Sequence, residues 1–230
     1  MRKLLRRLLV FILKFCVAFL AVSFLSVLVF RWVPVPVTPL MLLKCVEQKS
    51  NGKPVKLSKE WVSLDRISNH LQLAVVCSED QNYLEHHGFD FGAIEKAVSF
   101  NKKSRHIRGA STISQQTAKN VFLWPGRSWV RKGLEVYFTF LIELCWNKHR
   151  IMEVYLNVIE MGDGIYGAEQ ASETYFHKSP DRLQVSEAAL LAATLPNPIQ
   201  LSAAHPSSYL ISRQQWVQQQ MELWGGTLNY

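Results

Sequence analysis

The sequence of 230 residues lacks the short motifs that mark several common enzyme classes. It has no G-x-S-x-G elbow around Ser111, no Walker or dinucleotide-type glycine motif and no HExxH pattern, so it does not support a hydrolase triad, a nucleotide site or a zinc site built by the protein. His86 and His87 are adjacent, so their side chains point in different directions. The four cysteines lack CxxC spacing and lie among apolar neighbours, which is typical of core or membrane residues.

Acidic residues are also missing from one long stretch. Between Lys96 and Leu134 there are nine Lys or Arg residues and no Asp or Glu, so the stretch should attract phosphate. The whole chain carries a net charge of +8, but six of its 26 basic residues precede residue 32. The remainder has 20 basic and 18 acidic residues, which argues against a nucleic-acid partner.

The amino-terminal region predicts a membrane anchor. Residues 1–7 form a basic tail, and residues 8–31 form an apolar segment of which 23 residues would make about 35 Å of helix, enough to span a bilayer. The alternative is a cleaved signal peptide, but the run is longer than usual for one and no clear A-x-A site follows it. The excess of positive charge before the span places the amino end in the cytoplasm and the rest outside.

The rest of the chain predicts a single helical domain with little sheet. Residues 32–60 read as a connector and the start of the domain, and residues 61–230 as its body. The glycines of MGDGIYG, 161–167, predict a turn that ends a helix. Helical spacing recurs at 130–146, 151–159, 168–175, 186–194 and 212–224.

A pair of acids follows a buried-looking segment. The apolar run Leu73 to Val76 ends shortly before Glu79 and Asp80. A carboxylate delivered to the tip of an apolar segment is held partly out of water, where its pKa rises toward working pH. We therefore predict that Glu79 is the catalytic acid or base.

A polar, acid-free segment follows about twenty residues later. If residues 109–122 form a helix, its polar side chains share an arc of about 140°. Ser111 or Thr112 would then cap a helix start whose free N–H groups favour an anion. The alternative is an ordinary solvated face, but such a face normally mixes both charge signs. The polar arc comprises Ser111, Thr112, Gln115, Gln116 and Lys119.

A cationic group follows at helical spacing. Arg127, Arg131 and Glu135 stand at i, i+4 and i+8, with Lys132 beside them. The alternative is a surface ion pair worth a few tenths of a kcal/mol. In the functional interpretation the cations grip phosphate oxygens, and Glu135 orients them or holds a divalent ion that bridges a pyrophosphate.

Taken together, these segments resemble the monofunctional peptidoglycan glycosyltransferases of the cell envelope, which share the transglycosylase domain of class A penicillin-binding proteins. The matching blocks are EDQNYLEHHGFD (79–90), RGASTISQQTAKNVFL (108–123), RKGLE (131–135), KHRIMEVYLNVIEMGDGIYGAEQASETYF (148–176) and SEAALLAATLPNP (186–198). Two mild departures are Tyr83, where Phe is common, and Ala110, where a second glycine is usual.

The resemblance implies a mainly α fold, with a lysozyme-like helical head and a smaller membrane-proximal jaw after one transmembrane helix. It implies polymerisation of lipid II at a bacterial inner membrane, with inversion and release of undecaprenyl pyrophosphate. Glu79 would be the general base, Lys119 and Arg127 would stabilise the leaving group, and Glu135, also a catalytic residue, would line the donor site. It implies no organic cofactor, allows Mg²⁺ or Mn²⁺ at Glu135, and allows partners among other cell-wall synthesis or division proteins. The substrate-binding residues would be Asp80, Ser111, Thr112, Gln115, Gln116, Arg131 and Lys132.

Two rival functions remain at this point. A membrane-anchored lytic muramidase would use Glu79 as an acid, but it has no evident use for the cations. A non-catalytic envelope scaffold would not need Glu79 at all.

Overall fold

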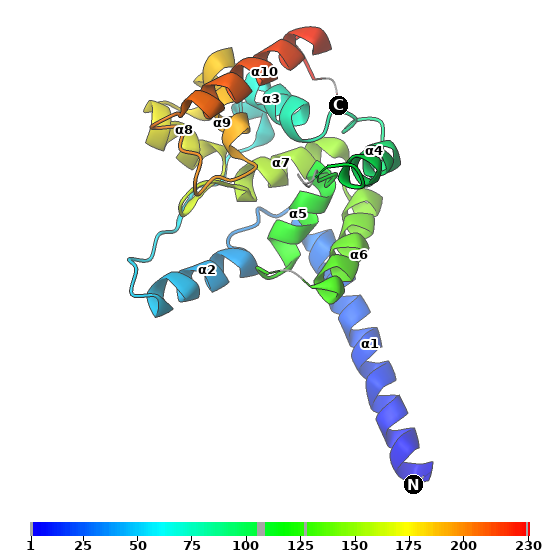
Figure 1. Cartoon of the computed structure of the whole chain (residues 1–230). Coiled ribbons are helices and arrows are strands. Elements are labelled where there is room, and N and C mark those ends of the chain that lie inside the picture. The colour runs from blue at the N-terminus through cyan, green and yellow to red at the C-terminus, as the bar shows by residue number, and fades with distance from the viewer. Residues whose placement is uncertain (1, 105–108, 127, 229) are drawn as a thin grey trace. The chain divides into compact units, whose positions relative to one another are not determined.

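The structure is a computed structural model that describes residues 2–104, 109–126, 128–228 and 230. The chain divides into two compact units, one up to Pro34 and one from Val35 to Tyr230. Helices dominate both units (Figure 1). The prediction of a mainly helical chain is therefore confirmed.

The first unit consists of one long helix, α1 (Arg2–Phe30), and the short segment after it. Its 29 residues give about 44 Å of helix at 1.5 Å per residue, more than a bilayer core needs. Within the described part of the chain, α1 is the one helix long and apolar enough to cross a membrane. The predicted apolar amino-terminal helix is confirmed, and it includes most of the basic tail.

The second unit packs its helices in two groups that meet at the site described below. Helix α3 packs on α9 and α10, while α5 packs on α6 and α7 (Figure 1). The bounds are α2 Pro39–Ser50, α3 Asn69–Glu79, α4 Phe91–Asn101, α5 Ile113–Phe122, α6 Trp129–Cys145, α7 Lys148–Val158, α8 Ala168–Phe176, α9 Val185–Thr194 and α10 Ser208–Trp224, with single 3-10 turns at Leu64–Arg66 and Pro180–Arg182.

Helix α3 is the buried centre of the first group. Its residues from Leu71 to Cys77 are all buried. Helix α9 offers mostly alanine and leucine on its buried side, including Ala188 and Ala192, so the two helices approach closely. The apolar run of the sequence is therefore a helix covered on all sides, which explains why it shows no amphipathic stripe.

The second unit also contains a small three-stranded sheet. Strand β3 (Ile165–Tyr166) lies between β1 (Ser58–Lys59), with which it is parallel, and β2 (Glu160–Gly162), with which it is antiparallel. Gly164 turns the chain between β2 and β3 at φ +75°, and a Cβ there would meet the backbone of Lys56 at 2.6 Å. The helix-ending turn predicted for these glycines is wrong: the turn closes a hairpin.

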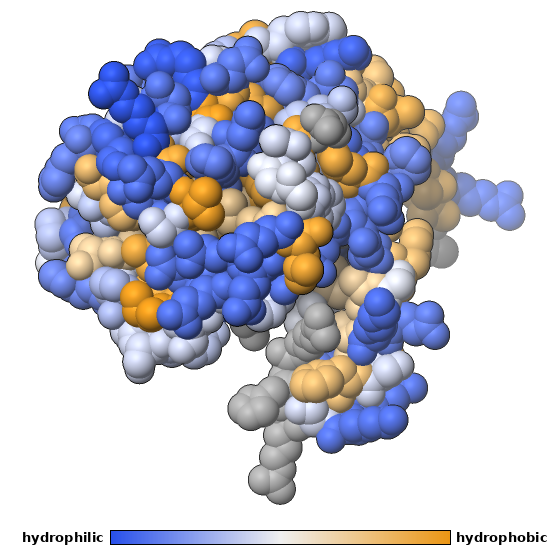
Figure 2. All heavy atoms as spheres, turned by 90° about the horizontal axis from the view of Figure 1, so that it is seen from above, coloured by the Kyte–Doolittle hydropathy of each residue, from blue (hydrophilic) through white to orange (hydrophobic). Residues whose placement is uncertain are grey.

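One end of the second unit carries a group of exposed apolar residues. Figure 2 shows that the face carrying α10 is mostly hydrophilic. At the other end of the unit in Figure 1, α2 lies close to the end of α5 and the start of α6. This end exposes Leu42, Leu43 and Val46 of α2 together with Trp124, Trp129 and Val130.

The buried side chain of Asn157 replaces a missing backbone partner. Its Oδ1 accepts from Val62 N at 2.9 Å, and its Nδ2 donates to Val62 O at 2.8 Å. Asn157 is fully buried, so Asn157→Ala would leave both groups of Val62 unsatisfied. We expect the free energy of unfolding to fall by about 2–3 kcal/mol, measured by urea denaturation.

The matched control is Gln219→Ala, which removes an exposed side chain from α10. It should change stability by less than about 0.5 kcal/mol. Equal effects of the two substitutions would contradict the role given to Asn157.

Candidate active site

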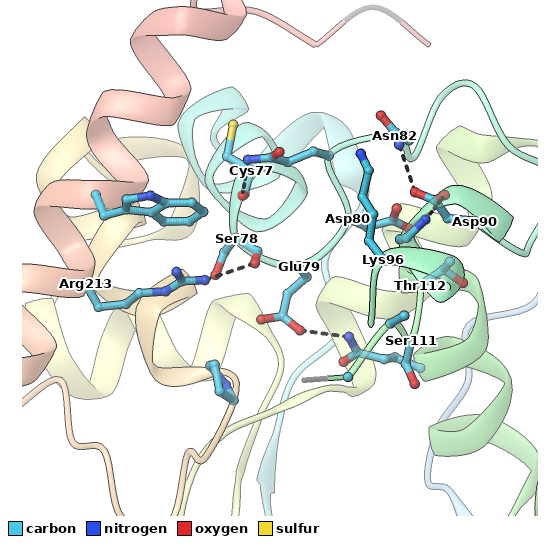
Figure 3. A pocket seen from close by; sticks show the side chains of 17 residues that line it. Cys77, Ser78, Glu79, Asp80, Asn82, Asp90, Lys96, Ser111, Thr112 and Arg213 are labelled. Carbon is cyan, nitrogen blue, oxygen red and sulfur yellow. Dashed lines mark hydrogen bonds between the residues drawn. The ribbon is translucent and has the colours of Figure 1, made fainter. Parts of the chain in front are cut away.

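Glu79 is the last residue of α3 and lines a pocket of about 650 Å³ (Figure 3). The helix ends there because Asp80 leaves the helical region, with φ −158° and ψ 74°. The pocket is bounded by the end of α3, the loop before α5, and α10. As predicted from the apolar run, the buried helix delivers a carboxylate to its own tip.

Gln116 of α5 holds the Glu79 carboxylate. Its Nε2 donates to Glu79 Oε2 at 2.8 Å, while its Oε1 accepts from the Tyr155 hydroxyl at 3.2 Å. Burial raises the pKa of Glu79, and the Gln116 hydrogen bond opposes this shift, followed by the charges of Arg213 and Lys119. Glu79 is thus a poorly solvated carboxylate whose polar neighbours favour its ionised form.

Asp80 is engaged inside the protein. Both of its oxygens receive His86 Nε2, at 2.9 and 3.0 Å, and Oδ2 also accepts from Ile113 N at 2.9 Å. Because His86 Nδ1 accepts from Gly88 N, the ring proton is on Nε2 and points at Asp80. Asp80 was predicted to bind substrate or to support Glu79; it lines the pocket, and its contacts clamp the end of α3 to the start of α5.

The loop before α5 is not helical, so the predicted helix 109–122 starts four residues too early. Helix α5 begins at Ile113 because Thr112 caps it: Thr112 Oγ1 accepts from Gln115 N, and Gln115 Oε1 accepts from Thr112 N. Thr112 Oγ1 also donates to Gly88 O at 2.7 Å. A Cβ at Gly88 would meet Glu143 and Thr139 at 2.9 Å, so this close approach requires glycine.

The capping box therefore occupies two residues of the predicted polar arc, Thr112 and Gln115. Gln115 is buried and serves the helix start, and the Thr112 hydroxyl is used in the cap although Thr112 lines the pocket. Ser111 is exposed at the pocket wall, and Gln116 reaches Glu79. The side chains left free for a ligand are those of Ser111 and Lys119, together with what remains of Gln116.

Lys119 lies one turn beyond Gln116 on α5 and is half-buried. Burial lowers the pKa of its ammonium, which Glu135 and Glu79 oppose by their negative charge. Within residues 2–104, 109–126 and 128–228, no hydrogen-bond or ion-pair partner holds Lys119 Nζ. A half-buried ammonium without a partner in the described residues gains from a ligand that supplies negative charge.

A cationic cluster adjoins Lys119 at the start of α6. Glu135 is buried and receives Lys132 Nζ at 2.5 Å, with Arg131 Nη1 at 3.7 Å. Arg131 Nε is buried without a hydrogen-bond partner in the described residues. Arg127, also predicted here, lies outside the described residues.

This arrangement gives Glu135 a role in orienting cations. Its charge is already shared by two of them, and the described residues contain no group of three His, Cys, Asp or Glu side chains that could hold a metal ion. A divalent ion at Glu135 would therefore have to take its other ligands from the substrate phosphates and water.

The structure brings the predicted residues together in two adjacent groups. Glu79, Asp80, Ser111, Thr112 and Gln116 line the pocket, whereas Arg131, Lys132 and Glu135 form the cationic cluster. Lys119 joins the two groups, because its charge interacts with both Glu79 and Glu135.

The wall formed by α10 was not predicted. Arg213 donates from Nη2 to Ser78 O at 3.2 Å, and its guanidinium lies 4.0 Å from the centre of the Trp216 ring (Figure 3). Both residues line the pocket. The available signal was an Arg and a Trp at i, i+3 in a glutamine-rich helix, which is too common a pattern to single out.

A poorly solvated carboxylate beside an unpartnered ammonium is the arrangement of a group-transfer enzyme with an anionic leaving group. The comparison with known proteins agrees. A transglycosylase family model matches residues 47–222, and the chain belongs to this family. It is a glycosyltransferase.

Relatives with the printed name biosynthetic peptidoglycan transglycosylase match most of the chain. The protein from Bacteroides thetaiotaomicron is 56% identical over 205 residues, covering 89% of this chain and 83% of its own length. The one from Pseudomonas syringae pv. syringae is 51% identical over 215 residues, covering 94% and 91%. The one from Chromohalobacter salexigens is 51% identical over 226 residues, covering 98% and 97%.

The adjacent acids Glu79 and Asp80 should respond oppositely to substitution. Asp80→Ala removes the acceptor of Ile113 N and His86 Nε2, and we expect it to lower the free energy of unfolding by about 2–4 kcal/mol. Glu79→Gln removes a carboxylate whose pKa burial raises, so it should not lower stability at pH 7.

Thermal and urea unfolding of the two variants at pH 7 would check this contrast. The sign follows from linkage: an acid with a raised folded pKa destabilises the fold above its unfolded pKa, and this penalty disappears in Glu79→Gln. A large loss of stability in Glu79→Gln would contradict the division of roles.

Proposed function

We propose that this glycosyltransferase polymerises lipid II into β-1,4-linked glycan strands and releases undecaprenyl pyrophosphate. The observation that carries the proposal is Glu79, held by Gln116 in a large pocket beside the half-buried ammonium of Lys119. The relatives named biosynthetic peptidoglycan transglycosylase support the choice of substrate.

In this reaction Glu79 is the general base. Its carboxylate removes the proton from the 4-hydroxyl of the acceptor sugar as that oxygen attacks the anomeric carbon of the growing chain. The new C–O bond forms on the face opposite the departing phosphate oxygen, so the configuration inverts. A carboxylate with a raised pKa is a stronger base than a solvated one, and the Gln116 hydrogen bond keeps it ionised.

The leaving group takes the electron pair of the broken C–O bond as a pyrophosphate anion. Lys119 is placed to receive this charge, and Arg131 and Lys132, held by Glu135, add to the positive field. Arg127 would join them. Cations in a poorly solvated site stabilise a developing anion more strongly than water does.

The muramidase alternative is not favoured. Cleavage of a glycosidic ether needs a carboxylic acid that protonates the leaving oxygen, whereas a pyrophosphate leaves as an anion. The cationic group of Lys119, Arg131 and Lys132 would stabilise a departing pyrophosphate, but it has no role in the cleavage of a glycosidic ether.

The proposed location is a bacterial inner membrane, with the amino end of α1 in the cytoplasm and the second unit outside. The apolar helix α1 supports a single-pass anchor, and four of its five basic residues precede the apolar part, with Lys14 within it. The exposed apolar end of the second unit, with Trp129 at 91% exposure, suits contact with lipid. Other cell-wall synthesis or division proteins are candidate partners at this membrane.

Removing the base should abolish polymerisation while keeping the fold. We expect Glu79→Gln to lower the rate of lipid II polymerisation by about 10²–10⁴-fold, the usual contribution of general base catalysis. In the wild type, activity should fall as the pH drops through the pKa of Glu79, at a pH above that of an exposed glutamate. Polymer measured on gels over a pH series checks both statements.

The matched control is Glu222→Gln, which neutralises an exposed glutamate of α10. It should retain the wild-type rate and pH profile. Shortening of preformed glycan strands by the wild type would favour the muramidase instead.

Removing the ammonium should slow the departure of pyrophosphate. We expect Lys119→Ala to reduce turnover by about 10²–10³-fold, because a lost charge-assisted contact to a developing anion costs a few kcal/mol. Lys49→Ala, at an exposed position of α2, is the control and should keep most of the activity. Full turnover of Lys119→Ala would remove Lys119 from the phosphate site.

A further inference from the structure

Tyr155 of α7 is fully buried and cannot touch substrate, yet its hydroxyl is linked to Glu79 through a single intervening side chain. It donates to Gln116 Oε1 at 3.2 Å, and Gln116 Nε2 donates to Glu79 Oε2 at 2.8 Å. The three side chains come from α7, α5 and α3, and the two hydrogen bonds join them in one continuous chain, here called the line. Its outer end is the proposed catalytic carboxylate.

The buried hydroxyl of Tyr155 decides which groups donate and which accept along this line. Burial raises the pKa of Tyr155 well above its usual range, so the phenol keeps its proton and remains a donor. A donor at this position attracts the oxygen of the Gln116 amide and leaves its NH₂ group pointing at Glu79. If the amide were reversed, its oxygen would face the Glu79 carboxylate, and the phenol proton would lose its acceptor.

The packing around Tyr155 prevents its side chain from moving. Its neighbours on α7, including Met152 and Leu156, are fully buried, and α7 packs against α5. The phenol therefore presents its hydroxyl from a fixed place. A side chain that fixes the amide of Gln116 also fixes the position and the ionisation of the carboxylate that the amide holds.

We propose that Tyr155 is a positioning residue for the base: it fixes the Gln116 side-chain amide so that its N–H holds Glu79 in the ionised, aligned form. This role rests on the proposed function of Glu79. It assigns α7 a part in the chemistry without any contact to the substrate.

Tyr83 provides a matched comparison within the same fold. It is also fully buried, and its hydroxyl donates to a backbone oxygen, that of Lys148, at 2.7 Å. Replacing either tyrosine by phenylalanine removes one buried hydroxyl and keeps the ring. The two variants should lose comparable stability, so a difference between them in the behaviour of Glu79 reports the line through Gln116.

The test measures the pKa of Glu79 directly, by carboxyl carbon NMR of the full chain in detergent without substrate. We expect Tyr155→Phe to raise this pKa by about half to one unit, because it weakens a hydrogen bond that favours the carboxylate. Tyr83→Phe should leave it unchanged. An unchanged pKa in Tyr155→Phe, with the variant folded by circular dichroism, would overturn the proposal.

The same shift should appear in the enzyme kinetics. A higher pKa moves the acidic limb of the polymerisation rate to higher pH and lowers kcat on that limb by about three- to tenfold, with KM changed less than twofold. A purely structural role would instead lower the amount of active enzyme at every pH. If the wild type does not polymerise lipid II, the proposed function fails while the NMR test still decides the coupling.

A double-mutant cycle shows whether Tyr155 acts through Gln116. Gln116→Leu should itself raise the pKa of Glu79, because it removes the direct donor. In that background Tyr155→Phe should add nothing to the shift. Independent, additive shifts would overturn the proposed route.

Discussion

The clamp formed by Asp80 holds the site together. Its Oδ2 accepts from Ile113 N at 2.9 Å, so the residue after α3 is bonded to the first residue of α5. Burying a carboxylate is costly, but the N–H of Ile113 and the imidazole of His86 satisfy it. Since Glu79 precedes Asp80 and Gln116 follows Ile113 by three residues, this one bond places the base beside its donor.

Burial acts in opposite directions on the two charged groups that the clamp brings near each other. It raises the pKa of Glu79 and lowers that of Lys119, so both groups are pushed toward their neutral forms. Each charge in turn favours the ionised form of the other. A substrate that gives a proton to Glu79 and places an anion beside Lys119 would therefore reduce the cost of burying both charges.

Much of this arrangement could be predicted from the sequence, since its signals are local. An apolar run that ends in acids predicted a buried segment with Glu79 at its tip, which is α3. The absence of acids between Lys96 and Leu134 predicted a cationic region. The predicted helical range 109–122 begins four residues too early, whereas Thr112, one of the two predicted cap residues, does cap α5. The contacts of Arg213 and Tyr155 could not be predicted, because each depends on which helices pack together.

The hydrogen bonds around Glu79 also separate the two chemistries open to a lone carboxyl group. An acid catalyst needs neighbours that favour the protonated form, such as an acceptor for its O–H. Here the described polar neighbours are the N–H donor of Gln116 and the cations Arg213 and Lys119, all of which favour the anion. Burial alone favours the protonated acid, whereas these groups favour the carboxylate, which is the form that the proposed transfer from a pyrophosphate needs.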